Sequence, residues 1–200
     1  YSLEYKGRKV VCDGGGPKLD AFRAPVDNDN WAYRQWFEKG LHNLKHRVTN
    51  YAWVNARKKD DNTIQLMYTV ESQAPNPAVL EGGKSGKNSV KELIERSFGT
   101  DDFKFITNQI WTIYPDGSIE LQSNITSNDA SLVVARLGYA MQIPSGLSRY
   151  TYYGRGPWNN YNDRRTGSFI EIYQSAVKEQ FVNFPKPQSM GNREEVRWCA

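Results

Sequence analysis

Residues 103–125 read FKFITNQIWTIYPDGSIELQSNI, and they contain the clearest hairpin signal of the chain. Apolar residues recur at about every second position on either side of Pro115-Asp116-Gly117-Ser118. These four residues have the composition of a tight turn, and a period of two is typical of strands with one buried face. The segment therefore predicts two antiparallel strands, 103–114 and 119–125, joined by the turn.

The period of two continues away from this hairpin in both directions, and it predicts a protein built mostly from strands. Residues 1–12 form a second hairpin around Gly7, and further strands are expected at 44–53, 64–70, 132–143, 150–153 and 168–173. One short helix is expected at 31–39, with Asp29 or Asn30 as its N-cap and Gly40 at its end. Many strands and almost no helix favour an all-β fold, a large antiparallel β-sandwich.

The length and the composition fit a single domain of this kind. Two hundred residues can bury one sizeable core, and 12 Tyr, 8 Phe and 6 Trp make the chain rich in aromatics. The 26 basic and 22 acidic residues are interleaved, as in Arg57-Lys58-Lys59-Asp60-Asp61, so we expect no nucleic-acid partner. No apolar run reaches membrane-spanning length, and we expect no membrane partner.

The two ends of the chain suggest a piece of a longer protein. The first residue is Tyr1, without a starting Met or a signal peptide, and residues 194–200 begin a strand-like alternation that stops. We therefore expect one β-sandwich domain over residues 1–200 that lacks strands on its C-terminal side. An unpaired sheet edge invites association, so a homo-oligomer is also expected. Two cysteines, Cys12 and Cys199, leave the cellular compartment open.

Residues 152–169 read YYGRGPWNNYNDRRTGSF and concentrate glycines, aromatics, amides and opposite charges. Gly154, Gly156 and Pro157 break the strand pattern and hold the backbone in a fixed bend. The three asparagines that follow offer side-chain groups that can satisfy an irregular backbone. Two interpretations remain open: a rigid corner between strands, or the polar and aromatic rim of a sugar site.

No catalytic or metal-binding pattern is complete in the sequence. His42 and His46 have the spacing of a helical zinc pair, but Asn43 replaces the glutamate that would act as base. Residues 27–29 begin like a calcium loop, yet Ala32 occupies the position that requires glycine. Gly82–Asn88 lacks the residues of a phosphate-binding loop, and no serine lies in a nucleophile elbow. Carboxylate pairs for glycoside hydrolysis meet in space, so spacing leaves them open.

Residues 22–29 read FRAPVDND, and residues 154–164 read GRGPWNNYNDR. Together they resemble the two signatures of the C-terminal small-chain domain of family 2 β-galactosidases, R-A-P-x-D-N-D and G-x-G-P-x-x-N-Y-x-D-R. The order of the two segments agrees with that family, and the Pro115-Asp116-Gly117 hairpin lies between them. The resemblance covers essentially the whole chain.

The resemblance implies a multidomain retaining glycosidase whose two catalytic glutamates lie in a central (β/α)₈ barrel outside this chain. The domain would be a large sandwich similar to galactose mutarotases, covering the mouth of the barrel. An aromatic side chain from a loop beyond Ala200 would reach the active site. Magnesium and sodium, which the family often uses, would bind elsewhere, so no catalytic residue, metal or cofactor is expected here. The expected partners are the other domains and, through the parent active site, a galactoside.

The sequence thus predicts an accessory domain of a β-galactosidase that is not catalytic by itself. A stand-alone carbohydrate-binding sandwich and a mutarotase-like sugar isomerase are the alternatives. Candidates for a substrate rim or for docking onto the barrel are Arg155, Trp158, Asn159, Asn160 and Tyr161, with Trp158 on the open side of the corner. The candidate structural motif comprises Arg23, Asp27, Asn28, Asp29, Asp163 and Arg164. We expect Asp27 and Asp29 to face Arg155 and Arg164, and Asp163 to face Arg23, so that the two segments brace each other.

Overall fold

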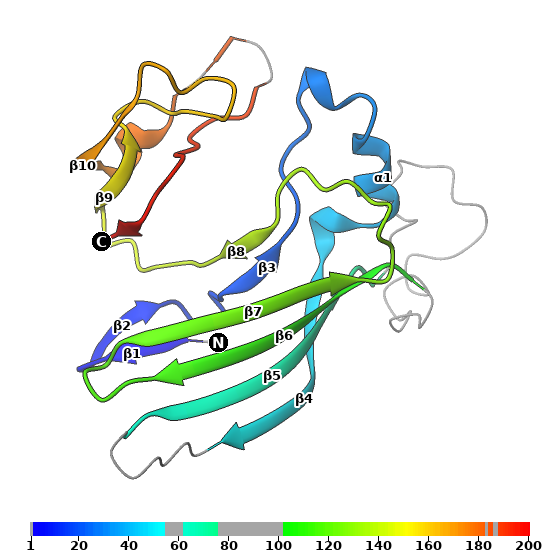
Figure 1. Ribbon diagram of the computed structural model, residues 1–200, viewed down its shortest axis with the longest axis vertical. Helices are drawn as coiled ribbons and strands as arrows, with labels where there is room; N and C mark the ends of the chain where they lie inside the picture. Colours follow the sequence, from blue (N-terminus) through cyan, green and yellow to red (C-terminus); the bar gives the residue numbers. More distant parts are fainter. Residues whose placement is uncertain (1, 55–61, 76–101, 183, 186–187) are drawn as a thin grey trace.

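The computed structural model of the chain describes residues 2–54, 62–75, 102–182, 184–185 and 188–200. The segment Gly82–Asn88 lies outside these residues. The described part forms four antiparallel sheets and one short α-helix (Figure 1). The prediction of an all-β, antiparallel, sandwich-like fold is confirmed, and the sandwich is not closed.

The largest sheet has the strand order β4-β5-β6-β7. Its strands are Lys45–Val54 (β4), Ile64–Gln73 (β5), Lys104–Ile113 (β6) and Ile119–Ser127 (β7). The predicted hairpin is the β6–β7 connection, where the Tyr114 N–H donates to the Ser118 carbonyl and Gly117 has a φ of 89°. The register of β4 against β5 shifts between Val48 and Asn50, which puts Val48 and Tyr51 on one face although three positions separate them.

Of the three smaller sheets, the β1–β2 and β3–β8 sheets lie next to the large sheet, whereas the β9–β10–β11 sheet lies apart from it (Figure 1). Leu3–Tyr5 (β1) and Arg8–Val11 (β2) form the predicted N-terminal hairpin, with positive φ at both Lys6 and Gly7 as a tight hairpin turn requires. Lys18–Asp20 (β3) pairs with Gly138–Ala140 (β8). Arg149–Gly156 (β9) is paired on one side with Phe169–Ala176 (β10) and on the other with Trp198–Cys199 (β11).

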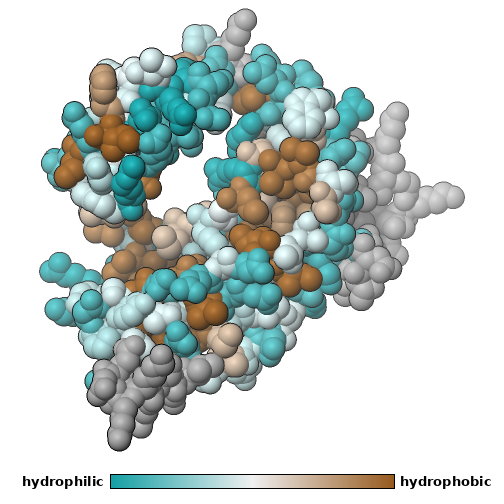
Figure 2. Space-filling view, in the orientation of Figure 1, coloured by the Kyte–Doolittle hydropathy of each residue, from teal (hydrophilic) through white to brown (hydrophobic). Residues whose placement is uncertain are grey.

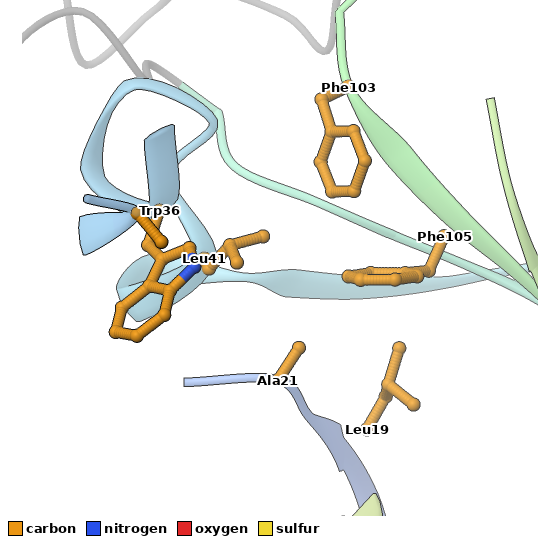
Figure 3. Close-up of a cluster of buried hydrophobic side chains, with 7 residues drawn as sticks. Leu19, Ala21, Trp36, Leu41, Phe103 and Phe105 are labelled. Atoms are coloured by element: carbon orange, nitrogen blue, oxygen red, sulfur yellow. The ribbon is translucent and has the colours of Figure 1, made fainter. Parts of the chain in front are cut away.

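The hydrophobic core lies between the short helix, β3 and the first residues of β6 (Figure 3). Its buried members are Leu19, Ala21, Ala32, Trp36, Leu41, Phe103 and Phe105. The rings of Phe103 and Phe105 meet edge to face at 5.0 Å, a favourable geometry for aromatic pairs. The Trp36 indole N–H donates to the Val133 carbonyl at 2.7 Å, so this buried polar group is satisfied.

Two local predictions are wrong in their details. The helix α1 spans Tyr33–Glu38, and its N-cap is Ala32 rather than Asp29 or Asn30. The Asp29 carboxylate instead binds the first turn of a separate 3₁₀ helix, η1, at Asp27–Asp29. Gly40 does end the helix, with φ at 69°. The expected strand at 132–143 is reduced to β8, because the backbone near Val133 contacts the helix instead of a sheet.

Two short 3₁₀ helices complete the described elements, Leu41–Asn43 (η2) and Val177–Gln180 (η4). The β9–β10–β11 sheet and the loops beyond it form a separate mass above the large sheet (Figure 1). A hollow lies between the two masses, and hydrophobic surface borders it (Figure 2). No helix among the described residues has the length and apolar character needed to cross a membrane.

Candidate functional site

The corner predicted from residues 152–169 forms where β9 ends. A Cβ atom on Gly156 would lie 2.2 Å from the Tyr152 hydroxyl and 2.9 Å from the Tyr173 ring. Real Cβ atoms do not approach other atoms this closely, so only glycine fits at this position. Tyr152 is itself buried at 1% exposure, and its ring stacks on that of Tyr150. The interpretation of this segment as a rigid corner therefore has a steric cause.

Asn160 is the buried centre of the corner, with an exposure of 0%. Its side-chain amide N–H groups donate to the carbonyls of Arg155 and Trp158, each at 2.9 Å. Its side-chain oxygen accepts the N–H of Glu194 at 2.7 Å. Asn160 thus cannot form part of an exposed sugar rim, and that candidate role is corrected to a structural one.

The partners of Asn160 come from a segment that sequence reasoning missed, Met190–Arg197. The Asn160 N–H donates to the Asn192 carbonyl, and the Asn192 amide donates back to the Asn160 carbonyl at 2.7 Å. The Arg193 guanidinium donates to the Tyr152 hydroxyl and to Gln180. A local signal was present in Gly191-Asn192-Arg193, which combines a turn glycine of φ 81° with amide and guanidinium groups.

Arg155 is also held by this late segment. Its guanidinium lies 3.0 Å from the Glu195 carboxylate and donates to the Ser168 carbonyl at 2.7 Å. Glu195 also lies 3.4 Å from Arg165. The expected contact of Arg155 with Asp27 or Asp29 is therefore wrong, because Glu195 takes the place of those carboxylates.

The first segment, residues 22–29, is braced from within. The Arg23 guanidinium makes a two-pronged contact with the Asp29 carboxylate, at 2.5 and 2.9 Å. The Val26 N–H donates to the same carboxylate at 2.7 Å. Burial raises the pKa of Asp29, but the hydrogen bonds from Arg23 and Val26 outweigh it and hold the pKa below 3.8. The lowered pKa favours the ionised form of Asp29, so this carboxylate is suited to a structural ion pair rather than to donating a proton near neutral pH.

The two segments nevertheless meet, across an open cleft of about 470 Å³. Its wall is formed by Arg23, Val26, Asp27, Asn28, Asp29, Tyr161, Asp163, Arg164, Gln188 and Ser189. An adjoining hollow of about 700 Å³ shares Arg23, Tyr161 and Asp163 and continues to Asn192 and Glu194. The predicted proximity of the two motifs is thus present, although the predicted pairing of charges is not.

Arg164 lies between two aromatic rings in this cleft, 4.9 Å from the Tyr161 centroid and 5.2 Å from that of Phe184. This arrangement places the cation over ring faces, where it is attracted by the π-electrons. Within the described residues, Asp27 and Asp163 form no ion pair, so the expected contact of Asp163 with Arg23 is also wrong. Arg23 is already saturated by Asp29.

The remaining candidates of the corner differ in exposure. Trp158 is 70% exposed, and its role in a substrate rim or in docking onto the barrel stays a prediction. The side-chain nitrogen of Asn159 and the hydroxyl of Tyr161 are buried and have no hydrogen-bond partner in the described part of the chain. Beside the exposed Trp158, the polar groups of Asn159, Asn160 and Tyr161 are thus buried.

The titratable groups of the described residues offer few starting points for chemistry. No cluster of three or more His, Cys, Asp or Glu side chains in this part of the chain could hold a metal ion. His42 packs against the Phe22 and Phe37 rings, whereas His46 contacts the Ser72 hydroxyl at 2.9 Å, so the two histidines do not share a site. Cys12 and Cys199 are free thiols.

Comparison with known proteins gives the context for this geometry. A family model described as β-galactosidase small chain matches residues 1–200. The β-galactosidase of Priestia megaterium is 32% identical over 89 residues, which cover 44% of this chain and 9% of that protein. The one of Lactobacillus delbrueckii subsp. bulgaricus is 37% identical over 82 residues, covering 41% and 8%.

A third relative, the β-galactosidase of Halalkalibacterium halodurans, is 26% identical over 200 residues, covering 98% of this chain and 17% of that protein. The chain therefore spans less than a fifth of the length of each of these relatives. With the family model matching from the first residue to the last, the chain belongs to the β-galactosidase small-chain family.

Proposed function

We propose that this chain is a non-catalytic accessory domain of a retaining β-galactosidase. In this proposal, the catalytic carboxylates lie in another part of the parent protein, and the domain packs over its active site. The observation that carries the proposal is the match of the small-chain family along all 200 residues, in proteins named β-galactosidase that are several times longer. The parent's other domains are then the main partners, and a galactoside is the substrate of the whole.

The distribution of apolar side chains supports this packing role. The segment between β7 and β9 exposes five large apolar side chains at 48–58% of their surface, namely Val133, Leu137, Met141, Ile143 and Leu147. This segment borders the hollow between the two masses of the fold (Figures 1 and 2). Contiguous apolar surface of this kind is typical of contacts between domains.

The cleft chemistry agrees with a non-catalytic role. Retaining hydrolysis requires a nucleophile and an acid about 5 Å apart, and the acid must have a raised pKa. Asp29, the buried carboxylate of the cleft, has a lowered pKa and is bound by Arg23. We therefore expect the purified 200-residue chain to release no chromophore from a nitrophenyl β-galactoside. Turnover that disappears on Asp163→Asn or Asp27→Asn would overturn this part of the proposal.

A chimera tests the accessory role directly. The matching segment of the Halalkalibacterium halodurans enzyme is replaced by this chain, and the hydrolysis rate is compared with that of the same enzyme lacking the segment. We expect the chimera to be active and the deletion to be inactive. An active deletion, or a folded but inactive chimera, would refute the proposal.

Two exposed tryptophans provide a matched pair within the chimera. Trp158 is 70% exposed in the corner, and Trp31 is 71% exposed at the start of the helix region. If Trp158 faces the parent active site, Trp158→Ala should lower kcat/KM by about tenfold, which corresponds to about 1.4 kcal/mol. Trp31→Ala should leave it unchanged, and equal effects of the two substitutions would count against an active-site role for Trp158.

A further inference from the structure

A cavity of about 370 Å³ is lined by residues of β3, the beginning of β4, the end of β5 and the middle of β6. It is separate from the cleft at the corner and shares none of its residues. The polar and charged side chains that line it are Lys18, Lys45, His46, Ser72, Thr107 and Gln109. Among the described residues, no carboxylate side chain lines this cavity.

The wall of the cavity includes a buried hydroxyl group without a hydrogen-bond partner in the described part of the chain. Thr107 is 1% exposed, and its side-chain oxygen makes no hydrogen bond within the described residues. Buried hydroxyl groups almost always have a hydrogen-bond partner. An unsatisfied one at the wall of a cavity therefore points to a bound group that supplies the missing acceptor.

The other neutral groups of the wall are already engaged. Gln109 donates to the Tyr139 hydroxyl at 3.2 Å and accepts the Trp111 indole N–H at 3.1 Å. Ser72 is fully buried, and its hydroxyl contacts His46 Nδ1 at 2.9 Å. Neither residue is left to accept hydrogen bonds from a ligand.

The groups that remain are positive or donate hydrogen bonds. Lys18 and Lys45 have no carboxylate partner among the described residues, and a lysine ammonium can only donate. The pKa of His46 is held below 6.5, mainly by burial and to a smaller extent by the charges of Lys18 and Lys45. Both lysines are therefore close enough to His46 to interact with it electrostatically. Protonation of His46 would leave Nδ1–H for Ser72 and provide Nε2–H as a second donor.

We infer that this cavity binds a small tetrahedral oxyanion such as sulfate or phosphate. Such an ion can accept hydrogen bonds on every oxygen. Its negative charge would pair with the two lysines, which have no carboxylate partner among the described residues. The Thr107 hydroxyl donates to it, and the lysine ammonium groups contact it. This inference goes beyond the accessory role proposed above and does not depend on it.

The histidines give a direct measurement, because the chain contains only two of them. The imidazole signals of the 200-residue chain are followed by NMR from pH 4.5 to 8, in sodium sulfate and in sodium chloride of the same ionic strength. Sulfate keeps its charge throughout, so changes report the protein. We expect sulfate to raise the pKa of His46 and to leave that of His42 unchanged, since His42 packs among aromatic rings away from the cavity.

The charged groups facing His46 are Lys18 of β3 and Lys45 of β4, whereas β5 and β6 contribute neutral side chains. Sulfate affinity should therefore fall as the pH rises through the pKa of His46. If the affinity falls tenfold, the pKa of His46 should be about one unit higher with sulfate bound than without it. Two unshifted histidines would show that the cavity contains water only. Equal shifts of both would indicate a general salt effect, and either result would overturn the inference.

Two variants test the residues assigned to the anion, and a third serves as the control. Thr107→Val keeps the shape and removes the orphaned hydroxyl, and Lys18→Met removes one charge. Each should weaken sulfate binding by about tenfold or more, because hydrogen bonds to charged groups are strong. Lys9→Met is the control, since Lys9 pairs with Asp13 and lies outside the cavity. Thr107→Val should not lower thermal stability in chloride, and unchanged sulfate binding in this variant would refute the assignment.

Discussion

The same substitution at the two adjacent asparagines of the corner should have effects of very different size. Asn160→Ala removes three hydrogen bonds, two to the carbonyls of Arg155 and Trp158 and one from the Glu194 N–H. Each is worth about 1 kcal/mol, and the buried partners that lose it are left unsatisfied, so we expect a loss of about 3–5 kcal/mol in the free energy of unfolding. Asn159→Ala removes a side-chain nitrogen that has no partner in the described residues, and we expect a change below about 1 kcal/mol.

Urea unfolding followed by far-UV circular dichroism measures both variants against the wild type. The transition midpoints are compared at equal slope, because a changed slope would indicate a different unfolded or folded state. Asn160→Asp adds a third comparison, since it keeps the size but presents an oxygen to both carbonyls. It should destabilise at least as strongly as Asn160→Ala. Losses at Asn160 no larger than the loss at Asn159 would refute the reasoning that this amide holds the corner together.

Two other predictions concern the same region. Gly156→Ala should lower the free energy of unfolding by about 1–3 kcal/mol or more, because the added Cβ would clash with Tyr152. A Cβ at Gly167 would meet no atom within 4 Å, so Gly167→Ala should be nearly neutral. Equal urea midpoints for the two variants would contradict the steric argument. Asp29→Asn should cost about 2 kcal/mol at pH 7 by weakening the contact with Arg23. Since the folded pKa of Asp29 is lowered, this stabilisation is present above about pH 4 and is lost as the pH falls through the folded pKa. If the variant and the wild type still differ in their free energy of unfolding at pH 2, the ion pair is not the source of the difference.

Local patterns predicted those parts of the fold that depend on neighbours in the sequence. The turn at Pro115–Ser118 and the end of the helix at Gly40 follow from backbone preferences that a few residues determine. The shift in register between Val48 and Asn50 was not predicted, since the period of two indicated only a strand at 44–53. The prediction of a strand was wrong where a side chain distant in the sequence binds the backbone, as the Trp36 indole does at the Val133 carbonyl.

The ion pairs of the candidate site were harder to predict, because the sequence shows which residues carry opposite charges but not which of them lie close together. The sequence places several aspartates and arginines in the two motifs, and any of them could pair. The structure pairs Arg23 with Asp29, six positions away, and Arg155 with Glu195, forty positions away. For Asn160 the sequence left two roles open, a group that satisfies an irregular backbone and a member of a sugar rim, and the structure shows the first. The burial of Asn160 depends on Asn192 and Glu194, and no short-range pattern connects them to it.

The dependence of the corner on Met190–Arg197 has a consequence during protein synthesis. Asn160 and Glu194 are 34 positions apart, and a ribosome adding about 5–20 residues per second needs about 2–7 seconds to make the chain between them. For that interval, the amide of Asn160 and the carbonyls of Arg155 and Trp158 have no late segment to close over them. The corner can therefore close only after residues 190–197 have been made, by which time the strands of the β4–β7 sheet have already been synthesised.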